Sequence, residues 1–156
     1  MIKTIGTLAL LSLATAAFAA PLTNAPQPSN VWAQQATKHM LSTKIMSLEA
    51  DGKFHGDAPV TRFQLAVTLE RFIHYIENGR KPLHATRSSP VIPLHATGDV
   101  RQAYAFLTSN NFIPRDSTLI TKPGNQPVTA SELGVVMGDV TIRISDRGLA
   151  PFKYQP

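Results

Sequence analysis

The sequence of 156 residues contains no cysteine. Disulfide bonds, thiol nucleophiles and cysteine-ligated metal sites are therefore excluded, and the fold must be stabilised by packing. The formal net charge is +5, but the basic residues are scattered rather than gathered in a tract. This charge favours an anionic partner only mildly, and we expect no nucleic-acid partner.

Long apolar runs are also lacking, except at the N-terminus. The first 19 residues carry a positive charge near their start, at Lys3. An apolar run from Leu8 to Phe18 follows, and the segment ends in small residues. This pattern is typical of a secretory signal peptide, and the run is short for a membrane span, although a retained anchor is the alternative. We therefore expect an exported protein with no membrane span after signal cleavage, located in the cell envelope, either the periplasm or the cell surface.

The rest of the chain contains an internal repeat. Residues 56–61 (Gly-Asp-Ala-Pro-Val-Thr) correspond to residues 124–129 (Gly-Asn-Gln-Pro-Val-Thr) at an offset of 68. Upstream, four apolar positions recur at an offset of 67: Ala36, Met40, Ile45 and Met46 correspond to Ala103, Leu107, Phe112 and Ile113. A fixed period of this kind predicts two copies of one supersecondary unit.

The first copy predicts two helices joined by a loop. Apolar residues at intervals of three to five predict a helix over about residues 30–43, and Asp51-Gly52 predicts a turn after it. A capping box formed by Thr61 and Gln64 predicts the start of a second helix, which should end at Asn78-Gly79.

The second copy looks more degenerate. Thr129 and Glu132 repeat the capping box, but Gly134 and Gly138 weaken the helix that follows, so a shorter helix is expected. Residues 140–144 (Val-Thr-Ile-Arg-Ile) alternate between apolar and polar, which predicts a short strand or an extended C-terminal tail.

The linker between the copies contains Pro-Leu-His-Ala-Thr twice, and its prolines predict a mostly non-helical connection. Its two histidines, His84 and His95, are candidate metal ligands, but they lack a ligand spacing such as His-x-x-x-His, and duplication of the linker explains the pair more simply. Asp51 and its acidic neighbours lack the ligand pattern of an EF-hand. We expect no metal and no other cofactor.

Catalytic motifs are also missing from the sequence. Glu70 and Glu77 share a helical face, but Arg71 and Arg80 beside them indicate a solvated helix surface rather than a pair of catalytic carboxylates. We therefore expect a protein that is not an enzyme.

Residues 30–76 resemble the S-layer-homology motif. The matching pieces follow in order and spacing: Val31-Trp32-Ala33, Asp51-Gly52-Lys53-Phe54, Pro59-Val60-Thr61-Arg62 and Leu69-Glu70-Arg71-Phe72. The second copy, at about residues 98–138, keeps Pro127-Val128-Thr129 and Glu132-Leu133, but it has Ala130 in place of Arg62 and no tryptophan.

The resemblance implies an all-α fold of two helix-loop-helix repeats and non-covalent anchoring to cell-wall polysaccharide or to a peptidoglycan-linked anionic polymer. It also implies that Thr61 and Arg62 contribute to binding acidic sugar groups. The positive end of a helix beside a guanidinium suits a carboxylate, which agrees with that role. Trp32 is a further candidate for stacking on a sugar, although its place on an apolar stripe favours core packing.

Proteins of this family commonly assemble three motifs, whereas this chain offers two. We therefore expect a homo-oligomer or an envelope-protein partner to complete the module. The alternative is a structural or interaction subunit of a larger envelope or S-layer complex that no longer binds polymer. The expected organisation is a signal peptide (1–19), a flexible segment (20–29), repeat 1 (30–78), a linker (79–97), repeat 2 (98–144) and a tail (145–156).

Overall fold

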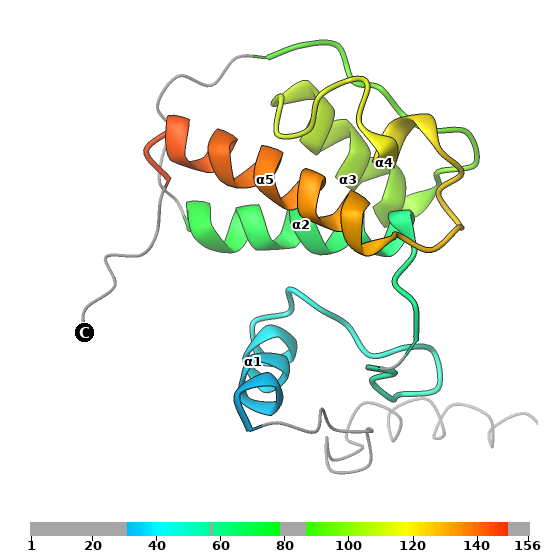
Figure 1. Cartoon of the computed structure of the whole chain (residues 1–156), viewed down its shortest axis with the longest axis vertical. Coiled ribbons are helices and arrows are strands. Elements are labelled where there is room, and N and C mark those ends of the chain that lie inside the picture. The colour runs from blue at the N-terminus through cyan, green and yellow to red at the C-terminus, as the bar shows by residue number, and fades with distance from the viewer. Residues whose placement is uncertain (1–30, 57, 79–86, 150–156) are drawn as a thin grey trace, which may run out of the picture. The chain divides into compact units, whose positions relative to one another are not determined.

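The computed structural model describes residues 31–56, 58–78 and 87–149 (Figure 1). Within them the chain is all-α, as predicted, and no strand is formed. The helices are α1 (Val31–Ser42), α2 (Arg62–Glu77), α3 (Gly98–Ser109), α4 (Thr118–Thr121) and α5 (Ala130–Asp146). None of these helices has the length and apolar character to cross a membrane. The predicted signal peptide, the segment 20–29 and His84 lie outside the described residues.

The chain divides into two compact units. Of the described residues, unit 1 contains 31–41, 47–56 and 58, and unit 2 contains 42–46, 59–78 and 87–149. The two helices of predicted repeat 1 therefore belong to different units, with α1 almost entirely in unit 1 and α2 in unit 2.

Unit 1 consists of α1 and the predicted turn. α1 buries none of its residues, and Trp32 is 77% exposed, so the core packing favoured for this side chain is not observed. The turn forms where Asp51-Gly52 predicts it: the Gly52 amide donates to the Glu49 carbonyl at 2.9 Å, and Gly52 adopts a φ of +76°. The Asp51 carboxylate caps the turn by accepting a hydrogen bond from the Lys53 amide at 3.0 Å.

α2 begins and ends where the sequence predicts. The Thr61 hydroxyl accepts a hydrogen bond from the Gln64 amide at 3.2 Å, and the Gln64 side chain accepts one from the Thr61 amide at 2.9 Å, which completes the capping box. Asn78 ends the helix in the left-handed conformation, with its amide bonded to the His74 carbonyl. The apolar face of α2 supplies Leu65, Ala66, Leu69, Ile73 and Ile76 to the core.

α5 corrects two predictions. It spans 17 residues and is therefore longer than α2, which has 16, and residues 140–144 are helical instead of extended. Its buried residues, Glu132, Val136, Val140 and Ile144, recur every four residues, which is the spacing of a helical face. Burial of this face offsets the low helix propensity of the two glycines, which is about 1 kcal/mol each.

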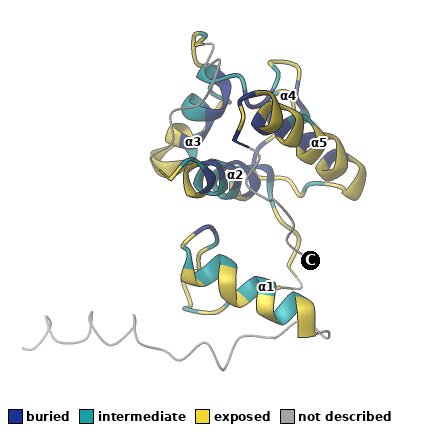
Figure 2. Ribbon diagram, turned by 90° about the vertical axis from the view of Figure 1, so that its left-hand side faces the viewer, coloured by how far each residue is buried: buried dark blue, intermediate teal, exposed yellow. Residues whose placement is uncertain are grey.

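The core of unit 2 lies where α2, α3 and α5 meet, and α4 closes one end (Figure 2). Tyr104 and Phe112 are fully buried at its centre. The Tyr104 hydroxyl donates to the Leu119 carbonyl at 2.8 Å and so connects α3 to α4. Residues 87–97 of the linker are non-helical, as predicted, and are attached to α3 by a hydrogen bond from the Val91 amide to the Thr108 hydroxyl.

The two predicted repeats share local features. The same capping box starts α2 and α5. Lys44 and Asn111, which are 67 residues apart, both adopt positive φ, at 59° and 54°, shortly after α1 and α3 end. The repeat organisation of the whole chain stays a prediction.

Candidate functional site

The two Pro-Val-Thr segments pair with each other in unit 2. They run antiparallel and form an isolated β-bridge between Thr61 and Pro127. The Val128 amide donates to the Val60 carbonyl at 2.8 Å, and the Arg62 amide donates to the Gln126 carbonyl at 3.1 Å. The starts of α2 and α5, which are far apart in the sequence, are thereby held side by side.

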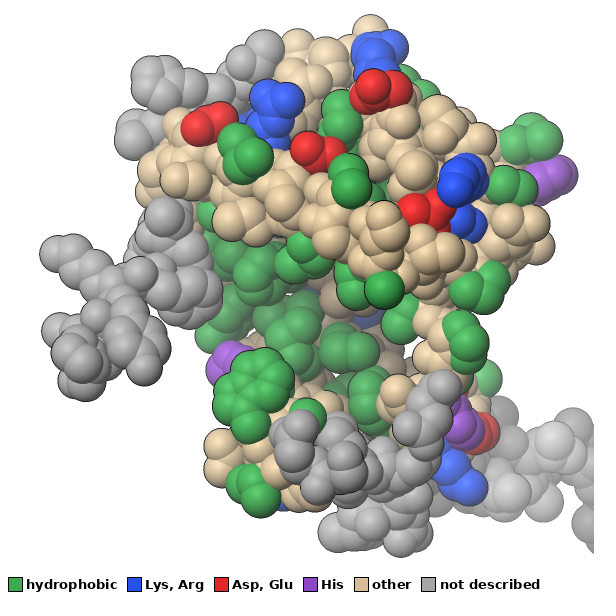
Figure 3. All heavy atoms as spheres, in the orientation of Figure 1, with side chains coloured by type: hydrophobic (Ala, Val, Ile, Leu, Met, Phe, Trp, Pro, Cys, Tyr) green, Lys and Arg blue, Asp and Glu red, His purple; other side chains and the backbone are tan. Residues whose placement is uncertain are grey.

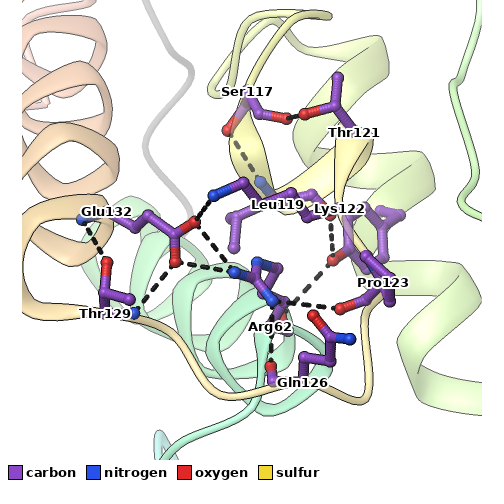
Figure 4. Close-up of polar contacts among 10 residues, drawn as sticks. Arg62, Ser117, Leu119, Thr121, Lys122, Pro123, Gln126, Thr129 and Glu132 are labelled. Atoms are coloured by element: carbon purple, nitrogen blue, oxygen red, sulfur yellow. Dashed lines mark hydrogen bonds and ion pairs between the residues drawn. The ribbon is translucent and has the colours of Figure 1, made fainter.

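Arg62 fills the space between these helix starts (Figure 4). Its guanidinium donates two hydrogen bonds to the Glu132 carboxylate, at 2.8 and 2.9 Å, and two more to the carbonyls of Pro123 and Gln126, at 3.2 and 3.3 Å. The residue is only 3% exposed. In this arrangement the guanidinium joins the α2 start to the α4–α5 loop, and an internal carboxylate occupies the place of an acidic ligand.

Glu132 has two roles at the start of α5. As the third helical residue it accepts a hydrogen bond from the Thr129 amide at 3.0 Å and completes the capping box. Its carboxylate also pairs with Arg62, and it lies 2.5 Å from the Lys122 ammonium. The hydrogen bonds from Lys122, from the Thr129 backbone and from Arg62 lower the pKa of the Glu132 carboxyl from 4.5 to about 2.

This pKa shift predicts an acid-sensitive fold. Because the folded-state pKa of Glu132 lies below the unfolded value, its stabilising contribution is complete above about pH 4.5 and is lost as the pH falls toward 2. The urea midpoint of unit 2, followed by far-UV circular dichroism, should therefore fall between pH 4.5 and pH 2. In the Glu132→Gln variant this fall should be smaller. An equal fall in both proteins would contradict the assignment.

The three predicted site residues lie in different environments. Arg62 is buried in the ion pair, and the Thr61 hydroxyl beside it is engaged in the helix cap. Trp32 lies in unit 1 and is exposed. The structure thus brings Thr61 and Arg62 together, but it directs their polar groups to partners within the chain.

A pocket opens beside the paired helix starts. Its volume is about 510 Å³, and most of its lining is apolar. Phe63, the residue after Arg62, lines it together with residues of the α4–α5 loop. Its polar lining groups include His95, Lys122 and Asn125, all from exposed residues, and the Lys122 side chain is 51% exposed although it is paired to Glu132.

Gly124 lines the pocket and allows Phe63 to pack closely on the α4–α5 loop. Phe63 packs so closely on it that a Cβ atom at Gly124 would lie 1.8 Å from the Phe63 ring. The Phe63 amide also donates to the Gly124 carbonyl at 2.9 Å. The loop is therefore fixed against the first turn of α2 by backbone and side chain together.

The pocket residues were not among the predicted site residues. A signal for part of them exists in the sequence, because Lys122-Pro123-Gly124-Asn125 ends four residues before the cap residue Thr129 and places a cation and an amide near a helix start. No sequence signal places His95 beside them, because the position of His95 depends on how the linker folds.

Chemically, this arrangement is suited to binding. The pocket offers an apolar wall, one ammonium, one imidazole and one amide, which can contact a ring face, an anionic group and hydroxyls. Within the described residues, no three His, Asp or Glu side chains are grouped closely enough to hold a metal ion. Comparison of the chain with family models, with curated proteins and with solved structures gives no match.

Proposed function

We propose that the protein is a non-enzymatic cell-envelope protein that binds cell-wall polysaccharide or a peptidoglycan-linked anionic polymer. The observation that carries this proposal is the pocket formed where the S-layer-homology-like helix start meets the α4–α5 loop. It couples the segment of highest resemblance to exposed polar groups that can receive a ligand.

The proposal assigns the binding contacts to the pocket instead of to Arg62. Phe63 supplies the apolar wall, Lys122 the positive charge for an anionic group, and His95 and Asn125 the hydrogen bonds to hydroxyls. Arg62 acts as a positioning residue, since it holds Glu132 and the carbonyls of the α4–α5 loop in place. Trp32 remains a separate candidate for sugar stacking in unit 1.

The test is co-sedimentation of the purified protein with purified cell-wall sacculi. We expect the native protein to sediment with the sacculi, and Lys122→Gln or Asn125→Ala to weaken binding about tenfold, the loss of one charged or well-placed hydrogen bond. Arg101→Gln is the matched control, because it removes one positive charge from the exposed surface of α3 and should leave binding unchanged. The thermal transition of each variant verifies that it is folded.

The second candidate is an interaction subunit of an envelope or S-layer complex that does not bind polymer. It is favoured by the burial of Arg62 and its pairing with Glu132, which engage the Arg62 guanidinium within the chain. Failure of the native protein to sediment with sacculi would reject polymer binding and leave this candidate. Sedimentation that is equally strong in Lys122→Gln, Asn125→Ala and the control would reject the pocket as the site.

A further inference from the structure

Lys122 connects the pocket to the buried ion pair. It lines the pocket, and its side chain is 51% exposed. Its ammonium nevertheless lies 2.5 Å from a carboxylate oxygen of Glu132, which is 8% exposed and is not among the residues that line the pocket (Figure 4). The positive charge that the pocket offers to a ligand is therefore already in contact with a carboxylate of the chain itself.

Glu132 keeps other partners if the Lys122 ammonium moves away. The Arg62 guanidinium donates to both carboxylate oxygens, at 2.9 and 2.8 Å, and the Thr129 amide donates to one of them at 3.0 Å. Arg62 is buried and fixed by its four hydrogen bonds, whereas the Lys122 ammonium stands at the end of a flexible, half-exposed side chain. Of the two cations, Lys122 is thus the one that can turn to an external anion.

The charges and the lining of the pocket indicate which ligand competes for Lys122. Arg62 and Lys122 carry two positive charges and Glu132 one negative charge, so this group of three has an excess of one positive charge. None of the described residues that line the pocket is acidic, and Phe63 and Ile120 belong to its apolar wall. Figure 3 shows cationic, histidine and hydrophobic side chains at the surface on the side of unit 2 where α4 and the loop to α5 lie in Figure 1. An apolar ring that carries a single carboxylate matches this combination.

We propose that Glu132 is an internal competitor of the ligand: a ligand carboxylate takes over the Lys122 ammonium, and Glu132 opposes this exchange. Glu132 thereby limits the affinity of the pocket for anions, although it does not touch the ligand. A neutral ring of the same shape gains no contact with the ammonium and binds more weakly. The inference rests on the pocket assigned in the proposed function, and it adds the ligand group and the residue that limits its binding.

The probe for this competition is cyclohexanecarboxylate, and the uncharged cyclohexanecarboxamide is its control. Both are titrated by NMR at one neutral pH, which keeps constant the protonation of His95, the other titratable residue that lines the pocket. We expect Glu132→Gln to bind the carboxylate at least about fivefold more tightly than the native protein, because glutamine attracts Lys122 less than glutamate does. The carboxamide should bind both proteins weakly and equally. An unchanged or lower affinity of Glu132→Gln for the carboxylate would overturn the proposal.

The same substitution in the Lys122→Gln background tests whether the gain passes through Lys122. Without the ammonium there is nothing to compete for, so Glu132→Gln should change the affinity for the carboxylate by less than about twofold. Far-UV circular dichroism verifies that each variant is folded. A gain as large as in the native background would contradict the competition and indicate a general effect of the added charge.

A third measurement uses the native protein and does not depend on the folding of a variant. The ¹³C signal of the Glu132 carboxylate should shift on saturation with cyclohexanecarboxylate, because the Lys122 ammonium leaves it, and should not shift with the carboxamide. A signal that stays in place while the probe binds, or no binding of the probe at all, would overturn the proposal without altering the sedimentation result. If the protein does not sediment with sacculi but the probe displaces Lys122, polymer binding is rejected and the competition stands.

Discussion

Replacement of Arg62 by methionine should lower the free energy of unfolding by about 3 kcal/mol, because removing one partner of a buried ion pair leaves the other without its counter-charge. Arg62 and Glu132 are 3% and 8% exposed, and the Arg62 guanidinium also satisfies two loop carbonyls. Because Lys122 remains beside Glu132 in the variant, we expect a loss of stability at the lower end of the range for broken buried ion pairs. Urea denaturation followed by far-UV circular dichroism measures the change. Fluorescence is unsuitable, since the single tryptophan lies in unit 1.

The control is Arg71→Met on the same helix. Arg71 faces Asp99 at 3.5 Å with side chains that are 32% and 77% exposed, so its loss should change stability by no more than about 0.5 kcal/mol. A cycle with Glu132→Gln sharpens the test, because glutamine preserves the capping box, as Gln64 does in α2. The double variant should lose less stability than the sum of the single variants. Additive losses, or an Arg62→Met variant as stable as the native protein, would contradict a structural role for the ion pair.

This role also changes how a loss of polymer binding in Arg62 variants should be interpreted. A variant that destabilises the α4–α5 loop disturbs the pocket indirectly, because Arg62 is bonded to the Pro123 and Gln126 carbonyls of that loop. Reduced binding in such a variant therefore does not identify a ligand contact. Asn125, which lines the pocket from an exposed position, gives the cleaner test, because Lys122 is itself bonded to Glu132.

The helix starts were predictable because their signals are local. Each capping box lies within four residues, so the sequence alone specifies which side chain caps which amide. The same holds for the Asp51-Gly52 turn and for the left-handed Asn78 at the end of α2. These elements depend on their own residues and not on the rest of the fold.

The length of α5 was mispredicted because two periodicities fit residues 140–144. Alternation groups Val140, Ile142 and Ile144 on one side of a strand, whereas a helix places only Val140 and Ile144 together. The structure buries those two and leaves Ile142 59% exposed, which identifies the helical arrangement. The choice is made by the core that α5 packs against, and that core is contributed by residues distant in sequence.

The Arg62–Glu132 pair was missed for a related reason. The two residues are 70 positions apart, and each has a sufficient local explanation, Arg62 as a helix-start cation and Glu132 as a capping residue. A hint was nonetheless present. A cation at a helix N-terminus is electrostatically unfavourable unless an anion is near, and the only acidic residue in the first turn of either helix is Glu132.

Replacement of Gly124 by alanine should lower the free energy of unfolding by about 3 kcal/mol, the upper end of the usual cost of overpacking. The new Cβ would lie 1.8, 2.2 and 2.4 Å from three carbons of the Phe63 ring, which is too close to be relieved by a small shift. The ring cannot simply rotate away, because it packs edge to face on the buried Tyr104, and the Phe63 amide is bonded to the Gly124 carbonyl. The expected change is a lower urea midpoint for unit 2.

Two comparisons separate this steric effect from a general effect of replacing glycine. Gly134→Ala in α5 is the matched control: apart from its chain neighbours and the backbone of its own helix, no atom lies within 4 Å of the added methyl. The higher helix propensity of alanine should therefore stabilise the protein by about 0.5–1 kcal/mol. Phe63→Leu combined with Gly124→Ala should recover part of the loss, because the smaller side chain vacates the ring position. If Gly124→Ala proves as stable as the native protein, the close packing of Phe63 on the α4–α5 loop is wrong, and the pocket assigned to the ligand must be formed differently.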